Sequence, residues 1–437
     1  MRTKKGTKVF CTVLILLATI GLATGFCTGQ GEKARVLTLW TGYAERLPVN
    51  EAAAADYMAE HPNVKIEISN FELRQAEEKY AISLPAGTAP DLFENGHLWI
   101  QRLITEEWLA PVPDKDVSWL KQNFDDVYLN AMSQKGKTYG IPWVHGFQVL
   151  FYNLDHYKEV GLSAPPNTLD ELMTHARKLA KTDAQGDLTR SGISLRLSGA
   201  GMGVAQKFDI FLFANGGSVM EPAGPGKWKA NFANEAGYKA LNFYLQALYK
   251  HKVDSYKVKH DSEAFVLGVT SQFNRETNVI GMARDNAPTM NYGITQVVGG
   301  DVQRATNLNC DGWVVPKNSE NIETAWDFAR FLNDDKYLVQ MVNVVGWCCT
   351  KSGVDYSEAY AKEPHFEQAF DRPKELKMIL APPATSFVEV YTKFASRLVE
   401  AFTDASLLDN RTKIMALLKD AEKEANDIIK SNGEYAE

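Results

Sequence analysis

The chain has 437 residues, of which 45% are hydrophobic and 23% charged, and its formal net charge at pH 7 is -7. This length exceeds what a single hydrophobic core usually holds, so we expect two or three domain-sized units. The proportions are those of a folded soluble protein, and the acidic balance argues against a nucleic-acid partner.

The N-terminus has the pattern of an export signal. Four basic residues within the first eight precede an uncharged apolar run from 9 to 23, which is short for a membrane span of about 20 residues. Loss of residues 1–26 would leave a net charge of -11 (-7 minus 4). We predict a signal peptide over 1–26, a polar tether over 27–34 and an exported body in the periplasm or on the outer face of the cell membrane.

The end of this signal suggests a lipid anchor. Thr24-Gly25-Phe26-Cys27 resembles a bacterial lipoprotein box, in which the cysteine becomes the lipid-bearing first residue. Phe26 departs from the small residue that such a box has before its cysteine. Lipidation of Cys27 is therefore one prediction, and ordinary cleavage after Ala23-Thr24-Gly25, without an anchor, is the alternative.

The remaining cysteines do not suggest a metal centre. Beyond Cys11 and Cys27 there are only Cys310, Cys348 and Cys349, an odd number without a CxxC spacing. We expect no metal and no cofactor. The adjacent pair Cys348-Cys349 would form a strained disulfide in an oxidising compartment, and reduced, buried cysteines are the alternative that we favour.

The first third of the chain alternates strands with helices. Strands are expected at 35–40, 64–69 and 90–93, and helices at 52–60, 74–84 and 98–109. This order predicts a mostly parallel sheet with helices on both faces, whose ligands sit at the carboxyl ends of the strands. Those ends carry residues 40–45 and 94–99.

The segment 139–179 is typical of a chain that passes from one lobe to another. A polar and aromatic mouth leads into an apolar strand at 147–152, and a helix at 169–181 follows, with Thr168 as its cap and Glu171 completing a capping box. Such a strand lies at the cleft between lobes, where ligand sites concentrate.

The rest of the chain repeats these features. Helices are expected at 208–214, 234–250, 264–272, 322–332 and, as a pair, within 388–429; strands are expected at 278–283 and 292–298; a polar loop is expected at 284–288. At 309–316 a polar mouth again meets an apolar strand, which predicts a second crossing between the lobes.

Seven short motifs, in this order, resemble those of the extracellular solute-binding proteins of ABC importers, in the carbohydrate-binding group that includes maltose-binding protein. They are Ala89-Pro90-Asp91-Leu92-Phe93, Tyr139-Gly140-Ile141-Pro142, Leu150-Phe151-Tyr152-Asn153-Leu154-Asp155, the run from Pro165 to Leu172, Asn215-Gly216-Gly217, Asn291-Tyr292-Gly293-Ile294, and the run from Ala325 to Leu332. Each motif is weak alone, but together they span the chain after residue 35.

The resemblance implies an α/β, two-lobed fold of the periplasmic-binding-protein type (type II), in which each lobe is a mixed, mostly parallel sheet flanked by helices. The implied lobes are 35–145 with 313–365, and 146–312 with 366–437. It also implies a monomer that closes on its solute by hinge bending and delivers it to the permease subunits in the membrane, without catalysis. Cys310-Asp311 stands where the family often has glycines, so we expect a bulkier cleft floor.

Sugars present flat C–H faces and many hydroxyls, so their sites combine aromatic platforms with planar polar side chains. The candidate platforms, on loops facing the cleft, are Trp40, Tyr43, Trp143, Trp313 and Trp347, whereas Trp326 is expected in the core. The candidate polar contacts are Thr41, Glu45, Asn95, His97, His145, Gln148, Gln206, Asp209, Arg284, Asp285, Asn309 and Asp311. Glu389 and Tyr391 stand where the family contributes a last cleft contact, and core or surface positions are equally compatible with their spacing.

Two other functions remain open from the sequence. A non-sugar solute such as a phosphorylated polyol would need a cluster of cations or a free helix N-terminus, for which Arg284 alone is thin support. A secreted glycoside-active enzyme would need paired carboxylates such as Glu45 and Asp285. The chain has no GxSxG, HExxH, phosphate loop or GxGxxG after a strand, which favours a receptor.

Overall fold

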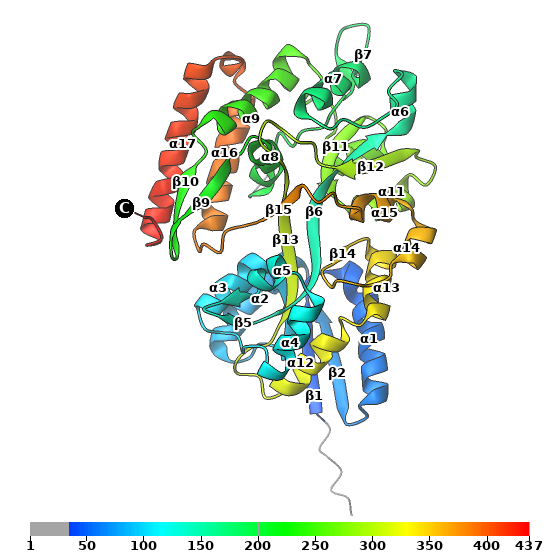
Figure 1. The fold of residues 1–437 in the computed structure, drawn as a ribbon, viewed down its shortest axis with the longest axis vertical. Coiled ribbons are helices and arrows are strands. Elements are labelled where there is room, and N and C mark those ends of the chain that lie inside the picture. The colour runs from blue at the N-terminus through cyan, green and yellow to red at the C-terminus, as the bar shows by residue number, and fades with distance from the viewer. Residues whose placement is uncertain (1–34, 200, 437) are drawn as a thin grey trace, which may run out of the picture.

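The computed structural model describes residues 35–199 and 201–436. Figure 1 shows two halves stacked along the long axis, which we call the lower and the upper half as they are drawn there. The predicted signal peptide, the tether and Cys27 lie outside the described residues. Within those residues, no helix combines the length and the apolar character that a membrane crossing requires.

The lower half begins with the predicted alternation. Its elements are β1 (Arg35–Thr41), α1 (Leu47–Glu60), β2 (Val64–Asn70), α2 (Leu73–Ala86), β3 (Leu92–Gly96), α3 (His97–Thr105), α4 (Asp114–Asn123), α5 (Asp126–Ala131), β4 (Ser133–Gln134) and β5 (Lys137–Thr138). β1 pairs in parallel with β2 and with β3. Leu37 and Leu39 of β1 are fully buried, and each such leucine contributes about 1.5–3 kcal/mol to folding.

Two long strands join the halves. β6 (Ile141–Asn153) and β13 (Arg304–Val314) run antiparallel side by side and are buried along most of their length. They place both halves on one sheet of order β11-β6-β13-β3-β1-β2, to which β12, β14 (Cys348–Cys349) and β15 (Leu376–Leu380) add at the sides. The two predicted crossings are confirmed as these strands, which form the waist of the molecule (Figure 1).

The upper half is mostly helical. Between the crossings it contains α6 (Leu154–Glu159), α7 (Leu169–Leu179), β7 (Lys181–Thr182), β8 (Leu188–Arg190), α8 (Gly203–Ala214), β9 (Ser218–Gly224), β10 (Lys227–Asn231), α9 (Glu235–Leu245), which continues as a π-helical turn at Gln246–Lys250, α10 (Asp261–Val266), β11 (Gln272–Glu276), α11 (Val279–Asn286) and β12 (Tyr292–Gln296). Thr168 caps α7 as predicted, because its hydroxyl accepts the Glu171 N–H at 3.2 Å. The Glu171 carboxylate accepts from the N–H of Asn167 rather than from that of Thr168.

The chain then returns to the lower half and finishes in the upper one. After β13 come α12 (Ile322–Phe331), α13 (Asp335–Val345), β14, α14 (Ser357–Lys362), α15 (His365–Phe370), β15, α16 (Phe387–Phe402) and α17 (Arg411–Ser431). Trp326 is 1% exposed in the lower core, so its prediction as a core residue is confirmed. Cys310, Cys348 and Cys349 are all free, and the first two are buried.

Two predicted elements are wrong. The strand expected at 278–283 is helix α11, and the polar loop expected at 284–288 begins as the last turn of that helix. Val279, Ile280 and Ala283 face the core at helical spacing, which a short apolar run does not distinguish from a strand. The helix expected at 264–272 also ends early, because residues 272–276 pair with β6 as strand β11.

Candidate functional site

Three rows of side chains cross the waist on one face of the two crossing strands. Pairing in the sheet aligns Asn309 with Gly146 and Asp311 with Val144. One step beyond the paired residues, the Gln148 side chain donates to that of Asn307 at 2.9 Å. Successive strand residues point to opposite faces, so the members of these rows share one face. Beyond β6, the row of Asn307 and Gln148 continues with Glu276 at the end of β11. We call this surface the polar face; it runs from the upper half to the lower half without a break in the sheet.

One of the partly exposed aromatic candidates, Trp347, lies over the middle row. A β-carbon placed on Gly146 would lie 3.0 Å from a ring carbon of Trp347, so this tryptophan lies directly over the glycine. Gly146 does not have a positive φ. It is therefore the close approach of Trp347, and not the backbone, that requires a glycine here.

Beyond this row, on the side of the lower half, a cluster of buried charged residues surrounds Arg46. The Arg46 guanidinium is fully buried and bonds Glu94 and Asp311, each at 2.7 Å. Thr41 also donates to Glu94. Burial raises the pKa of Glu94, and Arg46 opposes that shift. Breaking such a buried pair typically costs about 3–5 kcal/mol, so Arg46 fixes the position of both carboxylates.

Three rings surround the same guanidinium, those of Tyr43, Trp347 and, at 5.3 Å on the core side, Trp143. Arg46 lies 3.7 Å from the ring centre of Tyr43 and 5.0 Å from that of Trp347. Cation–π contacts of this kind contribute about 0.5–2 kcal/mol, more where water is excluded. Trp347 is therefore held between Arg46 and the glycine of the middle row.

The upper half supplies an ion pair to the same region. Lys207 of α8 bonds Glu276 at 2.7 Å, and a β-carbon on Gly146 would lie 3.7 Å from the Glu276 side chain. Burial lowers the pKa of Lys207 to about 8. For Glu276, burial acts upward, but Lys207 and Arg275 outweigh it and lower the pKa to about 2. Both groups are charged at neutral pH, and each neutralises the charge of the other.

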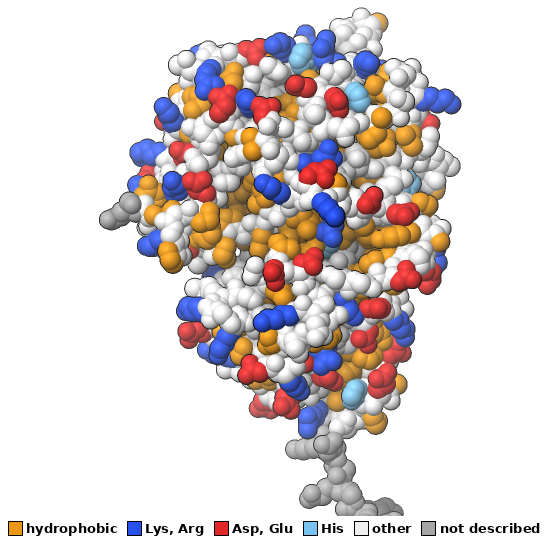
Figure 2. Space-filling model, viewed as in Figure 1, with side chains coloured by type: hydrophobic (Ala, Val, Ile, Leu, Met, Phe, Trp, Pro, Cys, Tyr) orange, Lys and Arg blue, Asp and Glu red, His pale blue; other side chains and the backbone are white. Residues whose placement is uncertain are grey.

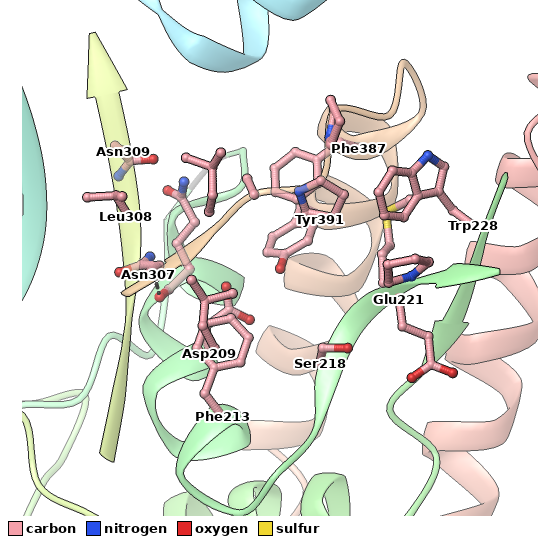
Figure 3. Close-up of a pocket in the computed structure, with 18 residues that line it drawn as sticks. Asp209, Phe213, Ser218, Glu221, Trp228, Asn307, Leu308, Asn309, Phe387 and Tyr391 are labelled. Carbon is pink, nitrogen blue, oxygen red and sulfur yellow. Dashed lines mark hydrogen bonds between the residues drawn. The ribbon is translucent and has the colours of Figure 1, made fainter. Parts of the chain in front are cut away.

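A cavity of about 340 Å³ opens between α8, α16, the β9–β10 hairpin and β13. Figure 3 shows Asn307 and Asn309 on one side of it and Phe387, Tyr391 and Trp228 on the other. Asp209 lies at its base; the side-chain oxygen Oδ1 has no hydrogen-bond partner, and burial raises the pKa of this carboxyl well above its usual range. Gln206 lines this cavity and links it to the polar face. The side chain of Gln148, on the polar face, donates to the backbone carbonyl of Gln206 at 3.1 Å.

The structure brings most of the predicted residues to this region. Those on the polar face, around the charge cluster or at the cavity are Thr41, Tyr43, Gln148, Gln206, Asp209, Asn309, Asp311, Trp347 and Tyr391. Asn95 and His97 are buried where β3 meets α3, beside Asp311, and each keeps one side-chain nitrogen without a partner. In Figure 2, hydrophobic side chains gather in a band across the waist, with charged side chains among them.

Three predictions about which way a side chain faces are wrong. Trp143 and Trp313 do not lie on loops facing the cleft, because they are in β6 and β13, at most 1% exposed, with ring centres 4.4 Å apart in the core. His145 lies on the face of β6 opposite to the polar face, where its Nδ1 meets the Tyr128 hydroxyl at 3.2 Å. A strand buried on both faces gives no sequence signal for which face is which.

Five further candidates are not among the residues of the polar face, the charge cluster or the cavity lining. Arg284 and Asp285 are exposed on α11 and bond each other; Arg284 also donates to the Asn343 carbonyl of α13. Glu45 and Glu389 are exposed. Trp40 packs against Phe71 and Tyr80, with ring centres 5.3 and 6.1 Å away. The prediction of a cleft loop for Arg284 and Asp285 is wrong, because the helix turns them outward.

Sequence reasoning missed four residues of the site and the pairing of a fifth. Asn307 stands two positions before Asn309, and strand alternation would have placed both on one face. Glu94 was predicted to lie at a ligand-bearing strand end, but its pairing with Arg46 was not predicted. Arg46, Lys207 and Glu276 gave no local signal, because the bonding partners in this group lie 48 to 265 positions apart along the chain. Among residues 35–199 and 201–436, no group of three or more His, Cys, Asp or Glu side chains is placed to hold a metal ion.

The fold and the waist define a two-lobed α/β binding protein. A family model for the bacterial extracellular solute-binding proteins matches residues 44–338, and the chain belongs to that family. An arabinooligosaccharide-binding protein of Bacillus subtilis is 24% identical and aligns over 96% of each chain. A binding protein of Brucella abortus is 23% identical over 65% of this chain and 68% of its own length.

Solved structures show the same architecture. The cyclic α-maltosyl-1,6-maltose binding protein of Arthrobacter globiformis superposes with a TM-score of 0.75 at 21% identity, covering 91% of this chain and 99% of that one. At this identity the likeness concerns the fold. The predicted α/β fold with two lobes, of the maltose-binding-protein type, is confirmed.

Proposed function

We propose that the chain binds a sugar or oligosaccharide at the polar face and in the adjoining cavity, and delivers it to an ABC permease by closing about the crossing strands. The observation that carries this proposal is the continuity of the polar face, which places amide and carboxylate side chains of both halves beside the Trp347 ring. A solute that contacts both halves binds the closed arrangement better and shifts the population toward it. The names of the Bacillus and Arthrobacter relatives, which bind oligosaccharides, support the same ligand class.

The lobes of this proposal are 35–145 with 313–365, and 146–312 with 366–437. The exported protein acts as a monomer, held at the membrane surface by lipid on Cys27. Its partners are the sugar and the permease subunits.

Binding of a sugar without its hydrolysis is consistent with the ion pairs that the carboxylates of this region form. A glycosidase needs one carboxyl group as an acid and a second as a base or nucleophile, on opposite sides of the scissile bond. Glu94 and Asp311 share Arg46, and Glu276 is held by Lys207. Glu45 is exposed and Asp285 bonds Arg284 on α11. Glu94, Asp311 and Glu276 are therefore committed to structural pairs.

The alternative of a phosphorylated polyol is less well supported. The charged residues that line the 340 Å³ cavity are Asp209 and Glu221, both acidic. The nearby Lys207 is neutralised by Glu276. A phosphate group would find no cation among the lining residues to pair with and would be repelled by Glu221.

Mass spectrometry of solute that co-purifies with the exported protein tests the ligand class, followed by incubation with that solute and analysis of products. A bound neutral sugar that raises the melting temperature and is recovered unchanged supports the proposal. Recovery of a phosphorylated solute, or of cleaved sugar, would replace it with the corresponding alternative.

A further inference from the structure

A second cavity, of about 300 Å³, lies at the waist on the other side of β6. His145 lines this rear cavity, whereas the next residue, Gly146, belongs to the polar face. Its walls come from α5 and the loop after β14 in the lower half, and from α14 and the segment between α15 and β15. Figure 1 shows these elements grouped around the crossing of β6. The rear cavity thus touches both halves and is separated from the sugar site by the crossing strands.

The rear cavity carries positive charge in an acidic protein. Its charged lining residues are Lys351, Arg372 and Asp125, which sum to +1 (two cations and one carboxylate), whereas the chain as a whole carries -7. His145 adds no charge at neutral pH, because burial, and then Arg372, hold its pKa well below its usual value. The 340 Å³ cavity on the other side has two acids and no base. The two cavities therefore differ in the charged residues that line them.

Arg372 has hydrogen-bonding capacity to spare. Its Nη1 lies 3.3 Å from the Tyr128 hydroxyl and 3.2 Å from the Met378 sulfur, and it forms no ion pair within the described residues. Lys351, in contrast, is held by Asp335 at 2.8 Å. The hydroxyl of Tyr356, also on the wall, interacts with the thiol of Cys349. A guanidinium without a carboxylate is a strong donor to a carboxylate or phosphate group.

Aromatic rings make up much of the remaining wall. The rings of Tyr356, Tyr360 and Phe370 lie with their centres 6.1 to 6.3 Å apart. Such rings favour an apolar or aromatic group over bulk water. The cavity therefore combines one free cation with an apolar wall.

We propose that the rear cavity binds a small organic anion, whose carboxylate or phosphate group pairs with Arg372 and whose apolar remainder lies against Tyr356, Tyr360 and Phe370. Asp125 is the one lining carboxylate, and it opposes the anion. Removing its charge strengthens binding, and removing that of Arg372 weakens it.

The position of this site couples it to the sugar site, a step that rests on the proposed hinge closure. The two cavities lie on opposite faces of the strands about which the halves bend, so closing one side opens the other. An anion that bridges Arg372 and the lower half favours the open arrangement. The anion then lowers the affinity for sugar, and the sugar lowers the affinity for the anion by the same factor.

Calorimetric titration of benzoate, and separately of inorganic phosphate, into the sugar-free protein tests the site. Benzoate carries a carboxylate and an apolar ring, whereas phosphate carries the anionic group alone. We expect saturable 1:1 binding of at least one of them, weakened about tenfold or more in Arg372→Gln, which removes one charge-assisted contact. Asp125→Asn is expected to bind more tightly than the wild type. Arg284→Gln, which removes an exposed arginine on α11, is the matched control and is expected to change nothing.

Absence of saturable binding by both probes, or equal binding in wild type and Arg372→Gln, overturns the proposal. Benzoate binding alone assigns the natural ligand to the carboxylates, and phosphate binding alone to the phosphates. The coupling is tested by titrating sugar with and without saturating anion: a lower sugar affinity in wild type but not in Arg372→Gln supports it, and an unchanged or higher one refutes it. If no sugar binds at all, the proposed function fails, and the anion titration still decides the rear site.

Discussion

Gly146 provides a direct test of how the tryptophan over the polar face is positioned. In Gly146→Ala the new β-carbon would lie 3.0 Å from one ring carbon of Trp347 and 3.7 Å from the Glu276 side chain. A contact of 3.0 Å forces the neighbour to move, and overpacking of this kind costs about 1–3 kcal/mol. Trp347 is partly exposed, so it can swing away and relieve the contact, at the expense of its orientation toward the ligand. We therefore expect a loss of sugar affinity of roughly 5- to 150-fold, with less than about 1 kcal/mol lost in the free energy of unfolding.

The assay is calorimetric titration of the sugar together with denaturant unfolding. Gly281→Ala is the control, because a β-carbon there would meet its nearest atom at 3.8 Å, an ordinary contact on helix α11. A double-mutant cycle with Trp347→Ala separates the cause: truncation of the tryptophan should cost much less affinity in a chain that already carries Gly146→Ala than in the wild type. Wild-type affinity in Gly146→Ala, or full additivity in the cycle, would refute the reasoning.

Three other changes probe separate parts of the site. Arg46→Met leaves Glu94 and Asp311 buried without their cation, so the free energy of unfolding should fall by about 3–5 kcal/mol in urea titration; a loss under about 1 kcal/mol would show that the cluster is not structural. Burial lowers the pKa of His97 to about 4, so the unfolded state takes up a proton before the folded state does, and the wild type should lose stability as pH falls from about 6.5 to 4, by roughly 3 kcal/mol from this group. In His97→Gln the free energy of unfolding should fall less steeply as the pH is lowered, by a difference equivalent to about one proton. An unaltered slope would contradict the assignment of this pH dependence to His97. Trp228→Ala removes a wall of the 340 Å³ cavity and should weaken sugar binding about 2- to 10-fold without changing the unfolding midpoint; unchanged affinity would place the sugar elsewhere.

The order of elements was predictable because each signal is local. The caps, the proline breaks and the hydrophobic periods lie within a few residues of the element that they define, and the capping hydroxyl of Thr168 is one example. The region around α11 was not predictable in this way. Its apolar run is too short for its period to distinguish a helix from a strand, and its packing partners decide the outcome.

On the crossing strands, the site was predictable where a polar residue interrupts an apolar run, as at Gln148, Asn309 and Asp311. The face of β6 on which the His145 side chain lies could not be predicted from the sequence. All but one of the residues of β6 are buried, so no polar–apolar alternation distinguishes its two faces. The charge cluster was hidden for a different reason. Arg46, in the turn after β1, and Asp311, on β13, are 265 positions apart, and only the fold brings their side chains within 2.7 Å.

The central claim is that a sugar is held on the polar face, by residues of both crossing strands and by the ring over Gly146. Its most direct test is calorimetric titration of the co-purified sugar into the wild type and into Asn309→Ala/Trp347→Ala, with the melting temperature of each measured in parallel. We predict 1:1 binding by the wild type, and loss of that binding in a variant that melts at a similar temperature. Undiminished affinity in the folded variant would contradict the claim and move the ligand away from the waist.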